Sequence, residues 1–88
     1  MTIDVSHQKN PAIGWDVNTV VTADKREKIA HVVIRVNGIP ECNEDVSPAA
    51  SSWKKNLVQQ GSYPGANKVV VTATNEKGED TDANDEWS

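Results

Sequence analysis

The sequence has no phenylalanine and only one leucine, one methionine and one cysteine among its 88 residues. Twelve valines, five isoleucines and six threonines carry β-branching instead, and β-branched side chains favour strands over helices. The single cysteine, Cys42, excludes an internal disulfide, and with two separated histidines it excludes a Cys/His metal cage. The composition therefore predicts an all-β domain whose stability comes from packing alone.

Long apolar runs are also missing. No segment approaches the roughly 20 apolar residues of a membrane span, and Met1–Asn10 lacks the basic and apolar regions of a signal peptide. A chain of 88 residues provides for one domain at most. We therefore expect a single domain over residues 1–88, with no membrane insertion and no signal peptide in this chain.

Excess charge is confined to the end of the chain. Seven acidic and eight basic residues up to Thr74 give +1, whereas six acidic residues and one lysine from Asn75 onward give −5, which together make the net charge of −4. No cluster of basic residues is interleaved with aromatic residues. Nucleic acid and anionic membrane surfaces both require such a basic surface, so neither is an expected partner.

The apolar residues alternate with polar ones almost throughout, which is typical of strands with one buried face. Strands are predicted at residues 3–5, 15–23, 29–36, 53–57, 69–74 and 79–87, with a further short edge strand beginning at residue 39. Tight turns are predicted at Asn37-Gly38 and over residues 75–78. The alternation disappears over residues 41–52, where we expect an irregular crossover containing at most one short strand. About seven short strands separated by turns predict an antiparallel, two-sheet Greek-key sandwich.

The alternation also predicts which side chains fill the space between the sheets. Six residues on inward positions should form one dry layer: Val17, Val21, Val32, Ile34, Val69 and Val71. Trp15 and Trp53 share the inward parity of their strands and are expected in the core. Trp87 follows an acidic strand, and either fixes that strand to the core or remains exposed.

Two blocks of sequence resemble immunoglobulin-like and fibronectin type III-like sandwich domains, especially small bacterial ones without the inter-sheet disulfide. The first is Val20-Val21-Thr22-Ala23-Asp24, followed by Ile29 and by residues 32–38 ending in Asn-Gly. It resembles the second strand, loop and third strand of that fold. The second block, residues 65–75 with Gly78, resembles the corner, sixth strand and final hairpin. Together the blocks cover about residues 15–80.

The sequence departs from the pattern of these domains at three points. The cysteine pair is absent, Asn67 stands where the fibronectin type has a corner tyrosine, and Tyr63 lies four residues too early for that role. The resemblance implies a non-catalytic interaction or spacer module that binds a protein partner and is surface-associated or part of an assembly. It also implies an extracellular or cell-surface location. These implications are analogies from the fold.

Residues suited to catalysis are few and scattered. A nucleophile, a base and an orienting group would have to come from serines, Cys42, His7, His31 and acidic residues. His31 lies on the outward parity of a regular predicted strand. Cys42 is flanked by Glu41 and Glu44, whose negative charge disfavours a reactive thiolate. We therefore predict no enzyme activity, no catalytic residue and no cofactor.

Two surfaces are candidates for partner binding. In the predicted topology the third and sixth strands are neighbours, so Val33, Arg35, Val70 and Thr72 should share one outer face. Two adjacent valines on an outer face make a small apolar patch of the kind that contacts another protein. The alternative is that these valines only strengthen the sheet through cross-strand pairing.

The second surface is a pole at one end of the sandwich. Sandwich domains usually present ligand contacts on loops. The charged residues of the two loops that should meet there are Lys25, Arg26, Glu76 and Lys77.

Two other functions are alternatives on the basis of the sequence. An exposed Trp87, together with Tyr63, would offer indole and phenol faces to a sugar ring, which makes a carbohydrate-binding module the first alternative. The carboxylates of residues 79–86 suggest a calcium-rigidified linker as the second alternative. Alternating carboxylates on an extended strand lie about 7 Å apart, however, which is too far for one ion. The sequence therefore favours a solvated, charged edge strand and predicts no metal ligands.

Overall fold

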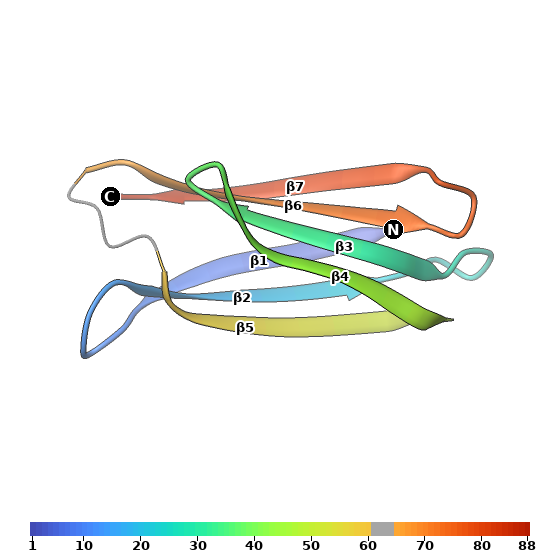
Figure 1. Cartoon of the computed structure of the whole chain (residues 1–88), viewed down its shortest axis with the longest axis horizontal. Coiled ribbons are helices and arrows are strands. Elements are labelled where there is room, and N and C mark those ends of the chain that lie inside the picture. The colour runs from blue at the N-terminus through green and yellow to red at the C-terminus, as the bar shows by residue number, and fades with distance from the viewer. Residues whose placement is uncertain (61–64) are drawn as a thin grey trace.

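The computed structural model describes residues 1–60 and 65–88, and this part of the chain forms seven strands in two sheets (Figure 1). The strands are β1 (Thr2–Lys9), β2 (Trp15–Thr22), β3 (Ile29–Val36), β4 (Ile39–Ala50), β5 (Ser52–Gln60), β6 (Asn67–Asn75) and β7 (Asp80–Trp87). One sheet has the order β1-β2-β5 and the other β4-β3-β6-β7, with every neighbouring pair antiparallel. The predicted all-β, two-sheet sandwich is confirmed.

The core is the predicted dry layer between the sheets. All six of the inward valine and isoleucine side chains named above are completely buried. Trp53 is 9% exposed and Trp87 7% exposed, so both belong to the core, and Trp15 packs against it. The structure thus decides the open question about Trp87, which fixes β7 to the core.

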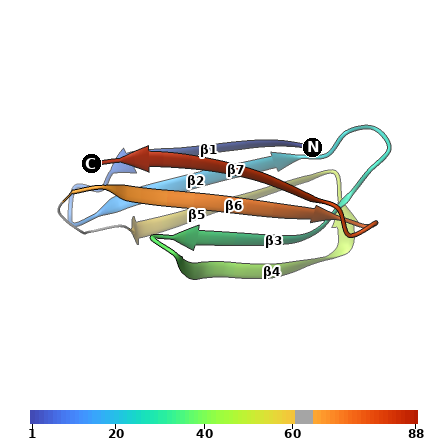
Figure 2. The ribbon, with the colours of Figure 1, turned by 90° about the horizontal axis from the view of Figure 1, so that it is seen from above.

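The chain crosses between the sheets three times, after β2, after β4 and after β5. The crossing after β4 is a sharp corner, where the backbone N–H of Ala23 donates to the carbonyl of Ser51 at 2.9 Å. Figure 2 shows the resulting four-stranded sheet, in which β4, β3, β6 and β7 lie side by side in that order.

The prediction for residues 41–52 is wrong. In place of an irregular crossover, β4 runs for 12 residues and pairs with β3, with Ile34 opposite Cys42 and His31 opposite Asp45. Its inward positions hold Cys42, Glu44 and Val46, so the alternation is present but one of its members is charged. An edge strand tolerates such an inward charge, because a long side chain there reaches solvent at the side of the sandwich where β4 and β5 meet. The first strand also continues to Lys9, beyond the predicted residues 3–5.

The predicted turns have the backbone that their residues suggest. Asn37 and Gly38 join β3 to β4 with φ values of 52° and 82°, which are the two consecutive positive values of a tight hairpin turn. Between β6 and β7 the N–H of Gly78 donates to the carbonyl of Asn75 at 3.0 Å.

Asn67 ties the turn between β3 and β4 to the start of β6. It is 2% exposed and accepts a hydrogen bond from Asn37 Nδ2 at 3.0 Å. Asn37 Oδ1 in turn accepts from the N–H of Lys68 at 2.8 Å. Although Asn67 stands at the position of the family's corner tyrosine, it is a buried, hydrogen-bonded residue here.

Candidate functional site

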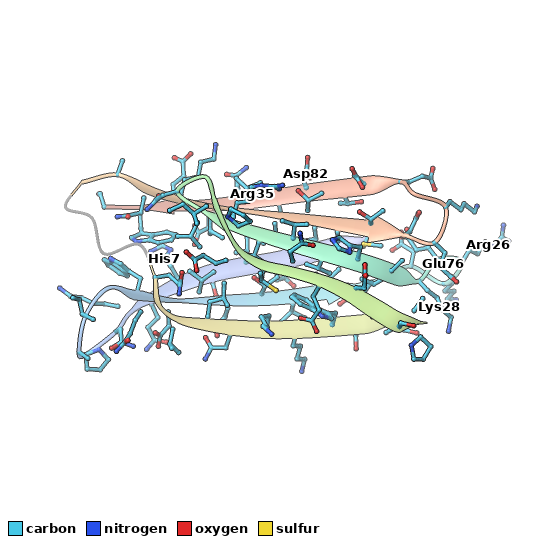
Figure 3. The ribbon with its side chains drawn as sticks, viewed as in Figure 1. His7, Arg26, Lys28, Arg35, Glu76 and Asp82 are labelled. Atoms are coloured by element: carbon cyan, nitrogen blue, oxygen red, sulfur yellow. The ribbon has the colours of Figure 1, made fainter. Side chains whose placement is uncertain are left out.

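The candidate partner-binding residues lie together on the outer face of the four-stranded sheet. Across β3 and β6, Val33 is opposite Thr72 and Arg35 is opposite Val70. Thr72 is in turn opposite Asp82 on β7. Figure 3 labels Arg35 and Asp82 on this side of the molecule. The adjacency expected from the topology is therefore present, and Asp82 extends it by a residue that the sequence did not point to. We call these five residues the outer patch.

The outer patch is apolar in its middle and surrounded by polar contacts. Val33, Val70 and Thr72 are half-buried by their neighbours on the sheet. Three polar contacts lie around them: His31 Nδ1 with Asp45 Oδ1 at 2.6 Å, Thr74 Oγ1 with Asp80 Oδ1 at 2.7 Å, and Lys68 Nζ with Glu86 Oε1 at 3.8 Å. These contacts satisfy polar groups at the periphery of the patch.

Arg35 and Asp82 differ from this periphery. Both side chains are exposed, and within residues 1–60 and 65–88 neither forms an ion pair or a side-chain hydrogen bond. Exposed charges without a partner on their own chain are available to a binding partner. The outer patch therefore combines two half-buried valines with one free cation and one free anion.

The two loops of the predicted pole do meet, but through different residues. Asn75 Nδ2 donates to Glu27 Oε1 at 3.1 Å and to Glu79 Oε1 at 3.0 Å. Asn75 Oδ1 accepts from the N–H groups of Lys77 at 2.9 Å and Glu79 at 3.0 Å. One asparagine therefore fixes the β6–β7 loop and joins it to the β2–β3 loop.

The charged residues predicted for this pole point outward. Lys25, Arg26, Glu76 and Lys77 are all exposed, and none of the four forms an ion pair in the part of the chain that the structure describes. Figure 3 shows Arg26 and Glu76 at this end of the sandwich. The pole therefore presents four charged side chains without ion pairs among the described residues, on loops that the hydrogen bonds of Asn75 fix in position.

Glu27 is the most strongly perturbed carboxylate at the pole. Its Oε2 lies 2.8 Å from the amino group of Met1, which also contacts Asp24 Oδ2 at 2.8 Å. The hydrogen bond from this amino group, followed by the one from Asn75, lowers the pKa of Glu27 to about 2. Hydrogen bonds first to Asp24 and then to Glu27 raise the pKa of the amino group. Both groups are therefore charged at neutral pH.

His7 belongs to a cluster that sequence reasoning missed. Its Nδ1 lies 2.5 Å from Asp85 Oδ2, and its ring stacks on Trp87 with centroids 5.0 Å apart. Trp15 meets the same ring edge-on at 5.5 Å. His7 lies on β1 and Asp85 on β7, so the cluster connects the two sheets at one side of the sandwich (Figure 3). The sequence did contain one signal for this cluster: His7 lies at every second position with Ile3 and Val5, so it shares the inward face of β1 with them.

The two histidines and the cysteine do not form a catalytic group. Each histidine contacts an aspartate, and among the residues that the structure describes no serine or cysteine side chain is hydrogen-bonded to either one. Cys42 is 8% exposed. Burial raises the pKa of its thiol, Lys55 opposes the rise, and Glu44 adds to it. The thiol therefore stays protonated at neutral pH, as its acidic neighbours suggested, although burial is the larger cause.

The sugar platform required by the first alternative is not present at Trp87. A hollow of about 450 Å³ opens beside this residue and is lined by Asn37, Asn67, Lys68 and Glu86 among others. Trp87 is only 7% exposed, so its indole does not offer its face to a ligand. Tyr63, the other aromatic residue of that prediction, lies outside the described residues. The sequence left open whether Trp87 is buried or exposed, and the structure buries it between the sheets, so this residue does not supply the exposed ring that the carbohydrate alternative needs.

The described residues carry neither a metal cluster nor a membrane-spanning helix. Among them, no group of three or more His, Cys, Asp or Glu side chains could hold a metal ion. The carboxylates of β7 alternate, with Asp85 turned inward to His7 and Asp82 turned outward. Within the same residues, no helix has the length and apolar character needed to cross a membrane.

Comparison with known proteins identifies the fold. No family model and no curated protein matches this sequence. Among solved structures, the chain is similar to the fibronectin(III)-like modules of Clostridium thermocellum CbhA, with a TM-score of 0.55 and 17% sequence identity. The match covers 97% of this chain and 90% of the other. The chain therefore has the fold of a fibronectin(III)-like, immunoglobulin-like β-sandwich module.

Proposed function

We propose that this chain is a non-catalytic interaction or spacer module, surface-associated or part of an assembly, which binds a protein partner through the outer patch. The likeness to a fibronectin(III)-like module supports this by analogy of fold. The observation that carries the proposal is local to the chain. Val33 and Val70 lie half-buried on an outer face, beside Arg35 and Asp82, neither of which forms an ion pair or side-chain hydrogen bond within residues 1–60 and 65–88.

The other sheet supplies a useful contrast. Its outer face carries Val20, which is half-buried between Asp4 on β1 and Lys54 on β5, and Val58 on β5, which is 53% exposed. Val58 is four residues along β5 from Lys54, so these two valines are not adjacent and do not form one apolar patch. The two valines and the threonine of the outer patch offer a larger continuous apolar surface, and each Å² of apolar surface removed from water contributes about 25 cal/mol. The outer patch is therefore the better docking surface of the two.

An affinity-capture experiment tests the proposal. Wild type, Val33→Glu, Val70→Glu and the matched control Val20→Glu are immobilised at equal density, and proteins captured from extracts of the source organism are quantified by mass spectrometry. A partner of the outer patch should be recovered at least about tenfold less by both patch variants and undiminished by the control. Equal recovery by all four baits would contradict the proposal. Thermal unfolding verifies that each bait is folded.

The loop pole is a second surface for the same function. Its four exposed charges, Lys25, Arg26, Glu76 and Lys77, lie on loops that Asn75 connects, so their positions are defined before a partner arrives. In the same capture experiment, Lys25→Glu combined with Arg26→Glu should release a partner that binds there. A partner lost from this variant and kept by Val33→Glu would assign binding to the pole.

A further inference from the structure

We propose that Asn37 is a site of spontaneous deamidation, and that the folded turn between β3 and β4 restrains this reaction until the turn opens. Asn37 is the only asparagine of the chain that is followed by glycine. A glycine has no side chain in front of its backbone nitrogen, so this nitrogen can approach the preceding side chain closely. The site is independent of the outer patch and of the proposed function.

The reaction is an intramolecular displacement followed by hydrolysis. The backbone nitrogen of Gly38 loses its proton to solvent and attacks Cγ of Asn37, so that a new C–N bond forms while the bond from Cγ to Nδ2 breaks. The amide nitrogen takes up a proton and leaves as ammonia, and a five-membered succinimide ring remains. Water then opens the ring at either carbonyl, which gives aspartate or isoaspartate. In total, one amide and one water become one carboxylic acid and one ammonia.

The attacking group is accessible in the turn. Gly38 is exposed, and a Cβ placed on it would meet no other atom within 4 Å. Its N–H donates none of the turn hydrogen bonds formed within residues 1–60 and 65–88. Asn37 also lines the hollow of about 450 Å³ beside Trp87, which brings solvent to the same turn. Both the nucleophile and the water that the reaction consumes are therefore at hand.

The folded turn nevertheless holds the two reacting groups apart. Asn37 Nδ2 donates to Asn67 Oδ1 at 3.0 Å, and Asn37 Oδ1 accepts from the N–H of Lys68 at 2.8 Å. The N–H of Asn37 donates to the carbonyl of Lys68 at 2.8 Å. The positive φ values of Asn37 and Gly38 are those of a type I′ turn, which places the Gly38 nitrogen across the Cα–C bond from the Asn37 side chain. The ring can therefore close only after these three hydrogen bonds open and the backbone rotates.

Conversion damages the contact that holds the turn. A carboxylate at position 37 still accepts from the N–H of Lys68, but it has no N–H to donate to the buried Asn67 Oδ1. Asn67 cannot turn its amide over without losing the bond from its Nδ2 to the carbonyl of Gly65 at 3.1 Å. Isoaspartate adds a methylene to the main chain of a two-residue turn, and such a turn fixes the register of its strands. Conversion should therefore loosen the pairing of β4 with β3.

Peptide mapping by mass spectrometry tests the site and its restraint. Wild type is incubated at mildly alkaline pH, folded and unfolded in guanidinium chloride, and the exchange of amide for acid is followed at every asparagine. Asn37 should convert first in both samples. One hydrogen bond of ordinary strength changes a rate about fivefold, so three should slow the folded reaction roughly 100-fold. Gly38→Asn keeps a residue that tolerates positive φ but shields the nitrogen, and conversion of Asn37 should be lost over the same time.

Two kinds of variant distinguish local opening of the turn from global unfolding. Asn67→Ala removes the acceptor of Asn37 Nδ2 and should speed the folded reaction about fivefold. Val5→Ala and Val17→Ala are the matched controls, because they remove core contacts on the other sheet and leave the turn intact. Urea unfolding measures the stability lost by each variant. The controls should convert at the wild-type rate, because the turn opens without the rest of the fold.

The product is separated by ion exchange through its added negative charge. Cys42, which lies opposite Ile34 in the pairing of β3 with β4, should react faster with a disulfide reagent in the product than in unconverted protein. An unchanged thiol rate would contradict the loosening of β4. Earlier conversion of another asparagine, equal rates in folded and unfolded protein, or wild-type conversion in Gly38→Asn would overturn the proposal. So would a control that loses no more stability than Asn67→Ala and converts as fast.

Discussion

The two long sides of the sandwich are closed in different ways. On one side β1 contacts β7, and His7 bonds to Asp85 while its ring is held between Trp15 and Trp87. On the other side β5 and β4 are joined by the ion pair of Lys55 Nζ with Glu44 Oε2 at 3.4 Å. The histidine and its aspartate are 32% and 25% exposed, whereas the lysine and glutamate are 41% and 45% exposed.

This difference indicates which side of the sandwich contributes more to the free energy of unfolding. Aromatic rings beside His7 cover part of its bond to Asp85, and a hydrogen bond that is partly shielded from water is electrostatically stronger. The Lys55–Glu44 pair is open to solvent, which screens its attraction, and holding two long side chains costs entropy. We therefore expect the β1/β7 side to contribute clearly more to the free energy of unfolding than the β4/β5 side.

The largest expected effect is at Trp87. Trp87→Ala removes the ring on which His7 stacks and leaves a cavity between the sheets, so the free energy of unfolding should fall by about 3–5 kcal/mol in urea titrations. Trp87→Phe should cost clearly less, because it keeps a ring there and removes an indole N–H that is buried without a hydrogen-bond partner among the described residues. A cost below about 1 kcal/mol for the alanine variant would contradict a structural role of this side.

The second effect concerns the pair of His7 and Asp85. A double-mutant cycle with His7→Ala and Asp85→Ala, measured by urea unfolding at pH 7, should give a coupling energy of about 1–2 kcal/mol. The reason is that the two groups bond across the sheets in a partly dry setting. Additive single effects would show that the bond contributes nothing and would remove the contrast between the sides.

The same cycle on the other side should give a smaller value. Lys55→Ala and Glu44→Ala remove the exposed ion pair, and their coupling energy should be about 0.5 kcal/mol or less and should decrease further at high salt. His7 with Asp85 serves as the internal reference under identical conditions. A coupling energy as large as that of the reference pair would reverse the comparison.

The smallest effect is chemical and concerns Cys42 on the β4/β5 side. Because its thiol is buried and its pKa is raised, reaction with a disulfide reagent should be slow at pH 7 and accelerate as pH rises past the ordinary thiol range. Urea-unfolded protein is the control and should react at the rate of a free thiol. Glu44→Gln should increase the folded rate modestly, since it removes a nearby negative charge; fast reaction of the folded wild type would contradict the burial.

The sequence was a good guide wherever the relevant signal was local. The inward residues of β2, β3 and β6 followed from alternation, because every second side chain of a strand faces the same way. The turn at Asn37-Gly38 followed from residues that tolerate positive φ. The outer positions of Val33 and Arg35 followed from the same parity. Each of these predictions required only neighbours in the sequence and the strand order of a known fold.

The failures have a common cause in contacts between distant residues. β4 was missed because Glu44 interrupts its apolar alternation. The inward charge is tolerated because Glu44 reaches solvent at the β4/β5 side and pairs there with Lys55, a contact that the sequence does not reveal. The bond between His7 and Asp85 joins residues 78 apart, and that between Glu27 and Asn75 joins residues 48 apart. Neither spacing carries a signal until the strands are arranged in space.

The sequence by itself determined an all-β chain and the identity of its core, because β-branched residues at every second position can bury only one face of a strand. Tertiary structure alone decided that Trp87 is buried and that Asp82 lies across β6 from Val33. The reason is that a side chain at the edge of one sheet is buried only if a strand of the other sheet packs against it, as β1 packs against β7 here. That arrangement is a property of the packed sheets, and alternation along one strand does not contain it.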